Sequence, residues 1–370
     1  MADYDITYLK KLTVSSEKDY AAFGRMAKLD DTHFIIATRD ALAHGMLYSV
    51  SIDANYDLTV EDSLEFQTTN NEGNSIVALD GTHFAVSCQG NVGDGFVGTY
   101  SVDANFDITL IDQFEFDTAS AYWTSICQMD STHLAVAYHE QYGAGYLKTF
   151  SMTAGFDSIA LVDTITTHNR DSDGNGFNAL VRIDSTHVIL AMTTGDSYIT
   201  TYSMDSSGDN LTEVDDLKWT TNNSTYISMK AIDDTHFAAA YTYGNTGVTT
   251  VFSINGSYEI AEDDSFTFET TRCYGGGISK IDGTHTVINW SGPDVDGFIG
   301  TYDLGSSLND ISNDDELEHN TTYGVSGDVL MIDDSHCVLI SSDSAVGLVA
   351  KTFDLNVPVV ATDTGFLLMF

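Results

Sequence analysis

Short apolar runs alternate with polar turns along the whole chain, and one such pattern recurs seven times. In the second copy, LDGTHF at residues 79–84, an apolar run ends in an aspartate, two small residues follow, and a histidine opens the next apolar run. The histidines of the seven copies are His33, His83, His133, His187, His236, His285 and His336. They are 50, 50, 54, 49, 49 and 51 residues apart. A period near 50 residues without helical periodicity is typical of a propeller blade or a β-solenoid.

The second repeat shows four segments with strand character. Residues 74–80 form an apolar innermost strand, and residues 83–88 form a second strand whose small residues suit tight packing. Residues 96–102 alternate large apolar residues with Gly, Thr and Ser, as a third strand, and residues 107–116 carry the charge expected of an outer strand. Seven such units predict an all-β fold, a seven-bladed β-propeller of four-stranded antiparallel blades. The chain has only two prolines, so the strands are uninterrupted.

One domain is predicted over residues 1–370, and its first strand belongs to its last blade. Residues 5–14 align with the outer strand at 107–116 although they precede the first innermost strand, so we expect them to close the ring beside residues 347–353. The C-terminal tail, 357–370, competes for this place, and we favour N-terminal closure. The predicted blades are approximately 20–68, 69–118, 119–168, 169–219, 220–269, 270–319 and 320–356.

The charge of the chain is strongly acidic. Its 55 acidic and 14 basic residues give a formal net charge of −41. This field repels nucleic acid and anionic membranes, and cations that screen it stabilise the compact state. A salt-adapted, halophilic protein and a merely soluble one both fit this composition. No apolar stretch approaches the roughly 18 residues of a membrane span, and the first residues lack the apolar core of an export signal. We therefore expect no membrane insertion and no signal peptide.

Sequence diversity among the repeats gathers on one face of the predicted disc. The loops between second and third strands differ in every repeat, and those between the outer strand and the next innermost strand are the longest. Both kinds emerge on the same face, which we call the variable-loop face, and loops on a rigid scaffold commonly carry binding residues. Aromatic rings beside Asp and Asn suit a sugar or a protein epitope, with Trp123 as first choice. The candidate contacts are Tyr122, Trp123, Tyr142, Tyr243, Tyr274 and Tyr323.

The seven repeat histidines resemble a metal site, but their spacing argues against one. Neighbouring blades pack about 10 Å apart, whereas two ligands of one ion lie within about 4 Å of each other. The histidines therefore cannot converge on a single ion. We expect each imidazole to make a structural hydrogen bond to the backbone or to the aspartate of its own turn.

A different loop offers oxygen ligands for Ca²⁺. Residues 171–176 read D-x-D-x-N-G, which places Asp171, Asp173 and Asn175 as alternating ligands before a glycine that permits a sharp turn. The bidentate glutamate of a complete helix–loop–helix site is absent, because Arg182 occupies that position. A short calcium loop and an ordinary Asx-rich turn both remain open, and no other cofactor is expected.

The repeat motif resembles repeat proteins of marine phages and environmental bacteria. The resemblance rests on D-[DSG]-[TS]-H-[FLV] followed by G-[FY]-x-x-T-[YF]-S, best matched at residues 80–116 and 130–150. It implies a propeller on a virion or an extracellular surface, and it implies no functional residues. Its expected partners are a glycan or protein on a host surface, or other virion proteins.

Motifs of common enzymes are missing, which favours a non-enzymatic protein. Neither G-x-S-x-G nor H-E-x-x-H occurs in the chain. The favoured interpretation is a viral spike, fibre or other surface propeller that contacts its partner through the variable-loop face. One alternative is a carbohydrate-binding lectin propeller. A second is a polysaccharide-degrading enzyme, which requires two carboxylates that converge on the axis of the propeller.

Overall fold

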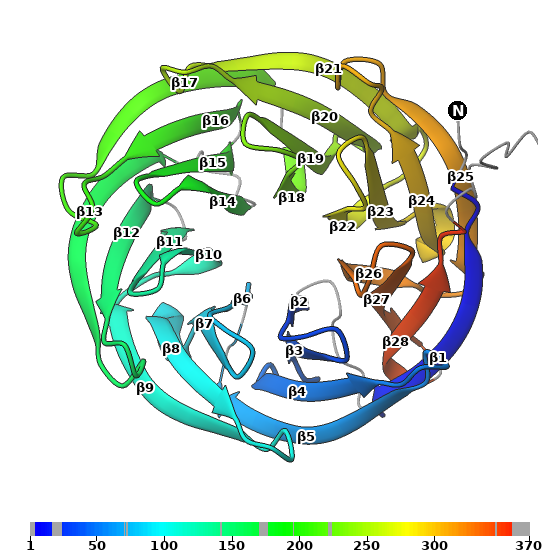
Figure 1. Cartoon of the computed structure of the whole chain (residues 1–370), viewed down its shortest axis with the longest axis horizontal. Coiled ribbons are helices and arrows are strands. Elements are labelled where there is room, and N and C mark those ends of the chain that lie inside the picture. Colours follow the sequence, from blue (N-terminus) through cyan, green and yellow to red (C-terminus); the bar gives the residue numbers. More distant parts are fainter. Residues whose placement is uncertain are drawn as a thin grey trace, which may run out of the picture.

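The computed structural model describes residues 4–16, 24–69, 71, 73–140, 143–169, 177–194, 196–220, 224–344 and 346–356. Over these residues the chain forms seven four-stranded antiparallel sheets, arranged as blades around a central axis (Figure 1). The described residues contain only two short 3-10 segments, Asn91–Gly93 and Pro293–Val295, and no helix long and apolar enough to cross a bilayer. The predicted seven-bladed propeller is confirmed.

The strands of successive blades follow the predicted order. The innermost strands are β2 (Arg25–Lys28), β6 (Ser75–Ala78), β10 (Tyr122–Asp130), β14 (Asn178–Asp184), β18 (Ser224–Ala231), β22 (Tyr274–Lys280) and β26 (Val325–Met331). The second strands are β3 (His33–Arg39), β7 (His83–Gln89), β11 (His133–His139), β15 (His187–Thr194), β19 (His236–Tyr243), β23 (His285–Ser291) and β27 (His336–Asp343).

The two remaining strands of each blade lie further from the axis. The third strands are β4 (Gly45–Ile52), β8 (Gly95–Val102), β12 (Ala144–Met152), β16 (Asp196–Ser203), β20 (Thr246–Ile254), β24 (Gly297–Asp303) and β28 (Gly347–Asp354). The outer strands are β5 (Leu58–Gln67), β9 (Ile108–Asp117), β13 (Ile159–Asn169), β17 (Thr212–Thr220), β21 (Ile260–Glu269), β25 (Ser312–Asn320) and β1 (Thr7–Ser15).

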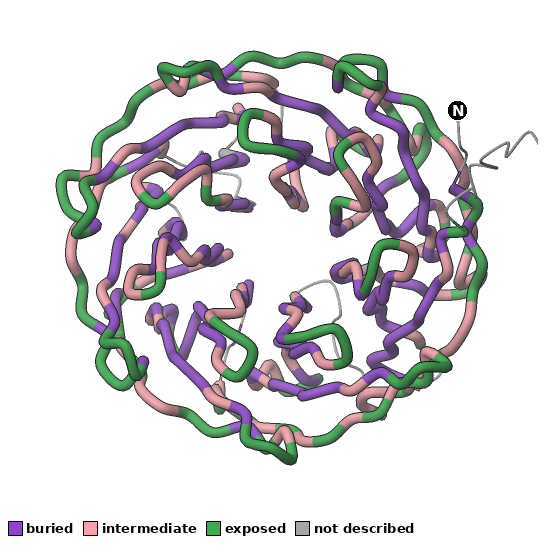
Figure 2. The backbone as a smooth tube through the Cα atoms, in the orientation of Figure 1, coloured by how far each residue is buried: buried purple, intermediate pink, exposed green. Residues whose placement is uncertain are grey.

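The second strands are more deeply buried than the outer strands at the rim. Second strands are buried at almost every position, because a blade packs on each of their faces, whereas outer strands alternate exposed and half-buried residues (Figure 2). The core is accordingly divided among the interfaces between blades. Seven apolar clusters are found among the described residues, each shared by two adjacent blades. Each blade therefore depends on both neighbours for its stability.

The N-terminal strand closes the ring, as predicted. Strand β1 pairs antiparallel with β28, from Thr7 opposite Asp354 to Ser15 opposite Leu348, and completes the blade of β26 and β27 (Figure 1). Tyr4, just before β1, is only 5% exposed within the apolar cluster between the sixth and seventh blades. The competing tail, 357–370, lies outside the described residues.

A belt of hydrogen bonds joins the outer strands around the rim. In each of six interfaces, an aspartate of one outer strand accepts a hydrogen bond of 2.7–2.8 Å from a backbone amide at the start of the next. The pairs are Asp62 with Ile108, Asp112 with Ile159, Asp163 with Leu211, Asp215 with Ile260, Asp264 with Ile311, and Asp315 with Ile6.

At the seventh interface an ion pair takes the place of this hydrogen bond. In the register of β1, Lys10 lies where the other outer strands have the aspartate, opposite Thr352. Its ammonium lies 2.9 Å from the Asp57 carboxylate of the first blade. The contact therefore joins the closing strand to the first blade.

Candidate functional site

Each repeat histidine contacts the aspartate of its own turn. In the first blade, His33 Nδ1 lies 3.0 Å from both carboxylate oxygens of Asp30, and Asp30 also accepts the backbone amide of Thr32 at 2.7 Å. Because an ionised carboxylate only accepts hydrogen bonds, this geometry places a proton on Nδ1. The same contact, at 2.8–3.1 Å, occurs at His83, His133, His187, His236, His285 and His336.

Several of these histidines also stack against an aromatic ring of the next blade. His33 stacks on Phe106 with ring centroids 3.5 Å apart, and His187 stacks on Tyr258 at 3.6 Å. The Tyr258 hydroxyl in addition donates a 2.8 Å hydrogen bond to Asp184, the turn aspartate of His187. These contacts connect adjacent blades and occupy the histidine rings. The proposal that the repeat histidines are structural is consistent with this environment.

The turn aspartates are held in the ionised form. Burial raises the pKa of the Asp184 carboxyl, but hydrogen bonds from the Thr186 amide, His187 and Tyr258 outweigh burial and lower that pKa to about 2. The pKa values of the other six turn aspartates are lowered as well, for the same kind of reason.

The turn aspartates predict a loss of stability in acid. A carboxylate whose pKa is lowered by folding stabilises the fold fully above its unfolded pKa of about 3.9. That contribution is lost as the pH falls through the folded value, about 2 for Asp184. Tyr258→Phe removes one donor to Asp184, so the melting temperature should fall less between pH 5 and pH 2.5 in this variant than in the wild type. Tyr8→Phe, on the exposed face of β1, is the control. Equal acid sensitivity of all three proteins would contradict the assignment.

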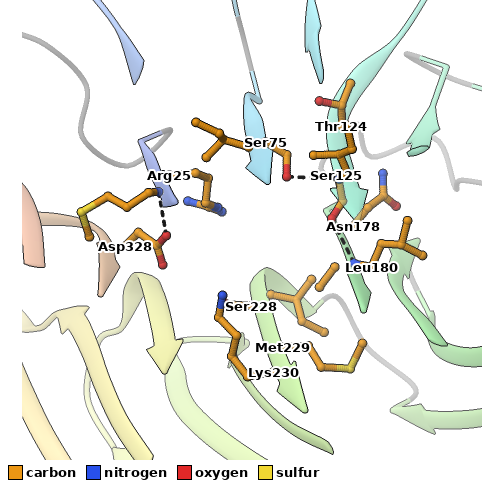
Figure 3. Close-up of a pocket in the computed structure, with 15 residues that line it drawn as sticks. Arg25, Ser75, Thr124, Ser125, Asn178, Leu180, Ser228, Met229, Lys230 and Asp328 are labelled. Atoms are coloured by element: carbon orange, nitrogen blue, oxygen red, sulfur yellow. Dashed lines mark hydrogen bonds between the residues drawn. The ribbon is translucent and has the colours of Figure 1, made fainter. Parts of the chain in front are cut away.

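Small residues on the innermost strands leave a cavity at the axis. Five residues before the turn aspartate, the seven blades carry Arg25, Ser75, Ser125, Ala179, Ser228, Gly277 and Asp328. The cavity there measures about 110 Å³, and we call it the axial cavity (Figure 3). It is lined by side chains that include Arg25, Ser75, Ser125, Asn178, Lys230 and Asp328.

The polar groups of the axial cavity also join neighbouring blades. The Ser75 hydroxyl accepts a 3.2 Å hydrogen bond from the Ile126 amide, and Ser125 accepts one of 3.0 Å from Leu180. One carboxylate oxygen of Asp328 accepts a 3.0 Å hydrogen bond from the Met26 amide, across the interface between the seventh and first blades. Its other oxygen accepts a 3.0 Å hydrogen bond from the Val329 amide. Asp328 is 4% exposed and is the only carboxylate that lines the cavity among the described residues.

Positive charge concentrates near the axis of this acidic protein. The seven innermost strands contain five of the 14 basic residues but only three of the 55 acidic ones. Two of the five, Arg25 and Lys230, line the axial cavity, and Figure 3 shows their head groups directed into it, with Asp328 beside Arg25. The cavity is therefore suited to an anion that also forms hydrogen bonds.

Aromatic rings form an arc at the edge of the axial cavity. Three consecutive blades have Trp123, Phe177 and Tyr226 seven residues before the turn aspartate, and their ring centroids are 4.3 and 4.7 Å apart. Tyr274 of the next blade lies 6.4 Å from Tyr226. These residues are at the beginning of the innermost strands, next to the loops that lead in from the outer strands. The arc therefore lies toward the variable-loop face.

A narrow extension of the axial cavity lies under this arc. It is lined by Trp123 and Phe177 together with Asn74 and Asn178. Asn74 is 3% exposed, and neither polar atom of its amide has a hydrogen-bond partner among the described residues. The Asn178 amide donates a 2.9 Å hydrogen bond to the Trp123 carbonyl, while its oxygen is buried without a partner among the described residues. The extension thus contains unused hydrogen-bonding capacity.

The predicted aromatic contacts are only partly brought together. Trp123 and Tyr274 belong to the aromatic arc, although Trp123 lies in strand β10 and not in a loop as expected. Tyr243 packs against the same apolar cluster as Trp123, between the fourth and fifth blades. Tyr122 contacts His139, and the Tyr323 carbonyl accepts a hydrogen bond from Asn320. Tyr142 lies outside the described residues.

The predicted calcium loop cannot be placed. Asp171, Asp173 and Asn175 lie outside the described residues, so calcium binding stays a prediction. In the part of the chain that the structure describes, no group of three or more His, Cys, Asp or Glu side chains could hold a metal ion.

Comparisons with known proteins identify the fold and no family. No family model matches the chain, and no curated protein matches it. Among solved structures, a candidate 6-phosphogluconolactonase from Bacteroides fragilis is similar with a TM-score of 0.65 and 12% identity, over 87% of this chain and 94% of that one. The periplasmic gluconolactonase PpgL of Pseudomonas aeruginosa has a TM-score of 0.60 and 12% identity, over 86% and 97%.

A third similar structure is a binding protein. Sqt1 of Chaetomium thermophilum, solved in complex with the N-terminus of a ribosomal protein, has a TM-score of 0.55 and 13% identity over 92% of this chain and 86% of that one. At these identities the likeness shows the propeller fold alone.

The expectation that the protein is not an enzyme is corrected by these comparisons. It rested on the absence of familiar enzyme motifs, yet two similar structures carry the names of lactonases. Missing motifs therefore do not exclude catalysis on this fold. The polysaccharide-degrading alternative required two carboxylates at the axis, and the described residues place only Asp328 in the axial cavity.

Proposed function

We propose that the protein binds a small hydroxylated carboxylic acid of the sugar-acid class in the axial cavity. The observation that carries the proposal is the pair of cations, Arg25 and Lys230, in one cavity of a chain with net charge −41. A guanidinium binds a carboxylate through two parallel hydrogen bonds, and an ammonium adds a point charge. The hydroxyls of Ser75 and Ser125 and the Asn178 amide line the same space and suit the hydroxyls of such a ligand.

Hydrolysis of a lactone is a second candidate function, favoured by the carboxylate in the same cavity. Asp328 faces the space beside Arg25 (Figure 3). A carboxylate there would accept a proton from an attacking water, and the two cations would stabilise the oxyanion that develops on the lactone carbonyl. The names of the two lactonases of similar fold support this chemistry.

From its sequence, the protein is expected to contact a host surface or another virion protein through the variable-loop face, and the axial cavity opens near that face at the aromatic arc. The aromatic arc at the edge of the cavity lies toward the variable-loop face, where a host glycan or protein was expected to bind. A role on a virion rests on the resemblance of the repeats alone.

Calorimetry with gluconate tests the proposed binding. The wild type should bind gluconate, and Arg25→Ala or Lys230→Ala should weaken binding at least about tenfold, or roughly 1.4 kcal/mol, because a charge-assisted hydrogen bond is lost. Lys280→Ala is the matched control, since it removes the same charge from an exposed position of β22 outside the cavity. Hydrolysis of glucono-δ-lactone above the spontaneous rate, lost in Asp328→Asn, would establish the second candidate. Absence of binding, or equal weakening in the control, would overturn the assignment.

A further inference from the structure

We infer that the ligand extends beyond the axial cavity, and that the aromatic arc with Asn74 forms a second subsite for a neighbouring sugar ring. The ligand would then be an acidic oligosaccharide that enters with its terminal uronic acid first. This inference rests on the proposed function, because the axial cavity must take the acid. It adds the substrate class and the residues that recognise the next sugar unit.

The two subsites are neighbours on the innermost strands. Arg25, Ser75 and Ser125 of the axial cavity lie five residues before the turn aspartate, and the first three rings of the arc lie seven residues before it. The innermost strands are not regularly extended over this stretch, because a bulge interrupts their pairing between Tyr122 and Ser125 and between Thr225 and Ser228. The cavity and its extension share Arg25 and Asn178 in their linings, so they are adjacent.

The backbone at the arc favours glycine, yet two blades keep large aromatic residues there. Trp123 and Tyr226 have positive φ angles of 52° and 54°, and the equivalent Gly73 and Gly275 have 67° and 62°. A residue with a side chain lowers the stability of the fold by about 1–2 kcal/mol relative to glycine when its φ angle is positive. Such strain at the edge of a cavity is typical of a functional position. Both rings are half-buried, so part of their surface is open to a ligand.

The unpartnered amides supply polar recognition beneath the rings. A buried amide without a hydrogen-bond partner lowers the free energy of unfolding by about 1–3 kcal/mol. In the extension, the whole Asn74 amide and the Asn178 oxygen have no partner among the described residues. The Asn74 amide offers one acceptor and two donors, and the extension, about 20 Å³ in volume, admits one hydroxyl group of a sugar that lies above it. The apolar face of the same sugar would pack on Trp123 or Tyr226.

Calorimetry with two probes, glucuronate and tri-galacturonate, separates this inference from the proposed function. Wild-type protein should bind the trimer at least about tenfold more tightly than glucuronate, because only the trimer reaches both subsites. Trp123→Ala and Asn74→Ala should each reduce the affinity for the trimer severalfold and leave that for glucuronate unchanged. Asn74→Ala should not lower the melting temperature, because the amide has no hydrogen-bond partner to lose among the described residues. Tyr8→Ala, an exposed aromatic of β1, is the control and should change neither affinity.

The possible failures point to different errors. Equal affinities of the wild type for the two probes would overturn the second subsite and leave the proposed function intact. Binding of neither probe would overturn both. If Trp123→Ala and Asn74→Ala weakened glucuronate and the trimer alike, the arc would belong to the axial cavity and not to a second subsite.

Discussion

Removal of residues 1–16 is expected to abolish cooperative folding. The deletion takes away β1, leaves the backbone groups of β28 unpaired along one edge, and uncovers the apolar cluster that Tyr4 and Ile6 complete with Phe353. It also removes the Asp315–Ile6 hydrogen bond and the Lys10–Asp57 ion pair, which join the closing strand to both neighbouring blades. An unpaired edge beside exposed apolar surface promotes aggregation.

Thermal unfolding and gel filtration of the truncated chain would measure this effect. We expect aggregation, or a broad transition without a clear midpoint, and recovery of a sharp transition when a peptide of residues 1–16 is added. Lys10→Ala with Lys11→Ala is the matched control, because it keeps the strand and changes only side chains near the surface. A truncated protein that melts like the wild type would show that the ring does not need this strand.

Trp290→Ala is expected to cost about 3–5 kcal/mol of unfolding free energy. Trp290, in β23, is fully buried in the apolar cluster between the fifth and sixth blades. Its ring centroid lies 4.9 Å from that of Phe268 and 5.6 Å from that of Phe298. Replacing the indole by a methyl group leaves a cavity, and the surrounding side chains cannot easily move in to fill it, because each blade is held by neighbours on both sides.

Urea unfolding of Trp290→Ala and Trp290→Phe would measure this cost. Trp290→Phe keeps an aromatic ring and removes an indole N–H that has no hydrogen-bond partner among the described residues. Its cost should be less than about half that of alanine, since a buried donor without a partner is itself unfavourable. Equal costs for the two substitutions would show that the aromatic contacts contribute little.

The sequence was sufficient to predict the blades and the closure of the ring. The repeat of aspartate turn and histidine fixed the boundary between first and second strands in all seven blades, since each second strand begins at its histidine. The closing strand was predicted at 5–14 and is observed at Thr7–Ser15, because its sequence is that of an outer strand. Both features are local patterns that one sequence displays directly.

The site was predicted less well, because it depends on which side chains meet at the axis. Trp123 was selected as a loop residue, but a strand positions it toward Phe177. Arg25 and Asp328 were missed, although aligning the repeats would have shown them as the two charged residues at a position otherwise occupied by Ser, Ala and Gly. The unpartnered amide of Asn74 could not be predicted, because hydrogen-bond partners become visible only in three dimensions.

The closing strand also has a consequence for how the protein folds. Of the 21 strand pairings in the described residues, 20 join strands that are consecutive in the chain, and the remaining one joins Thr7 to Asp354. Each four-stranded unit can therefore form early through local contacts, whereas the last pairing must bring together the two ends of nearly the whole chain. The rate-limiting step of folding should consequently be the docking of β1, and the transition state should resemble an open arc of blades.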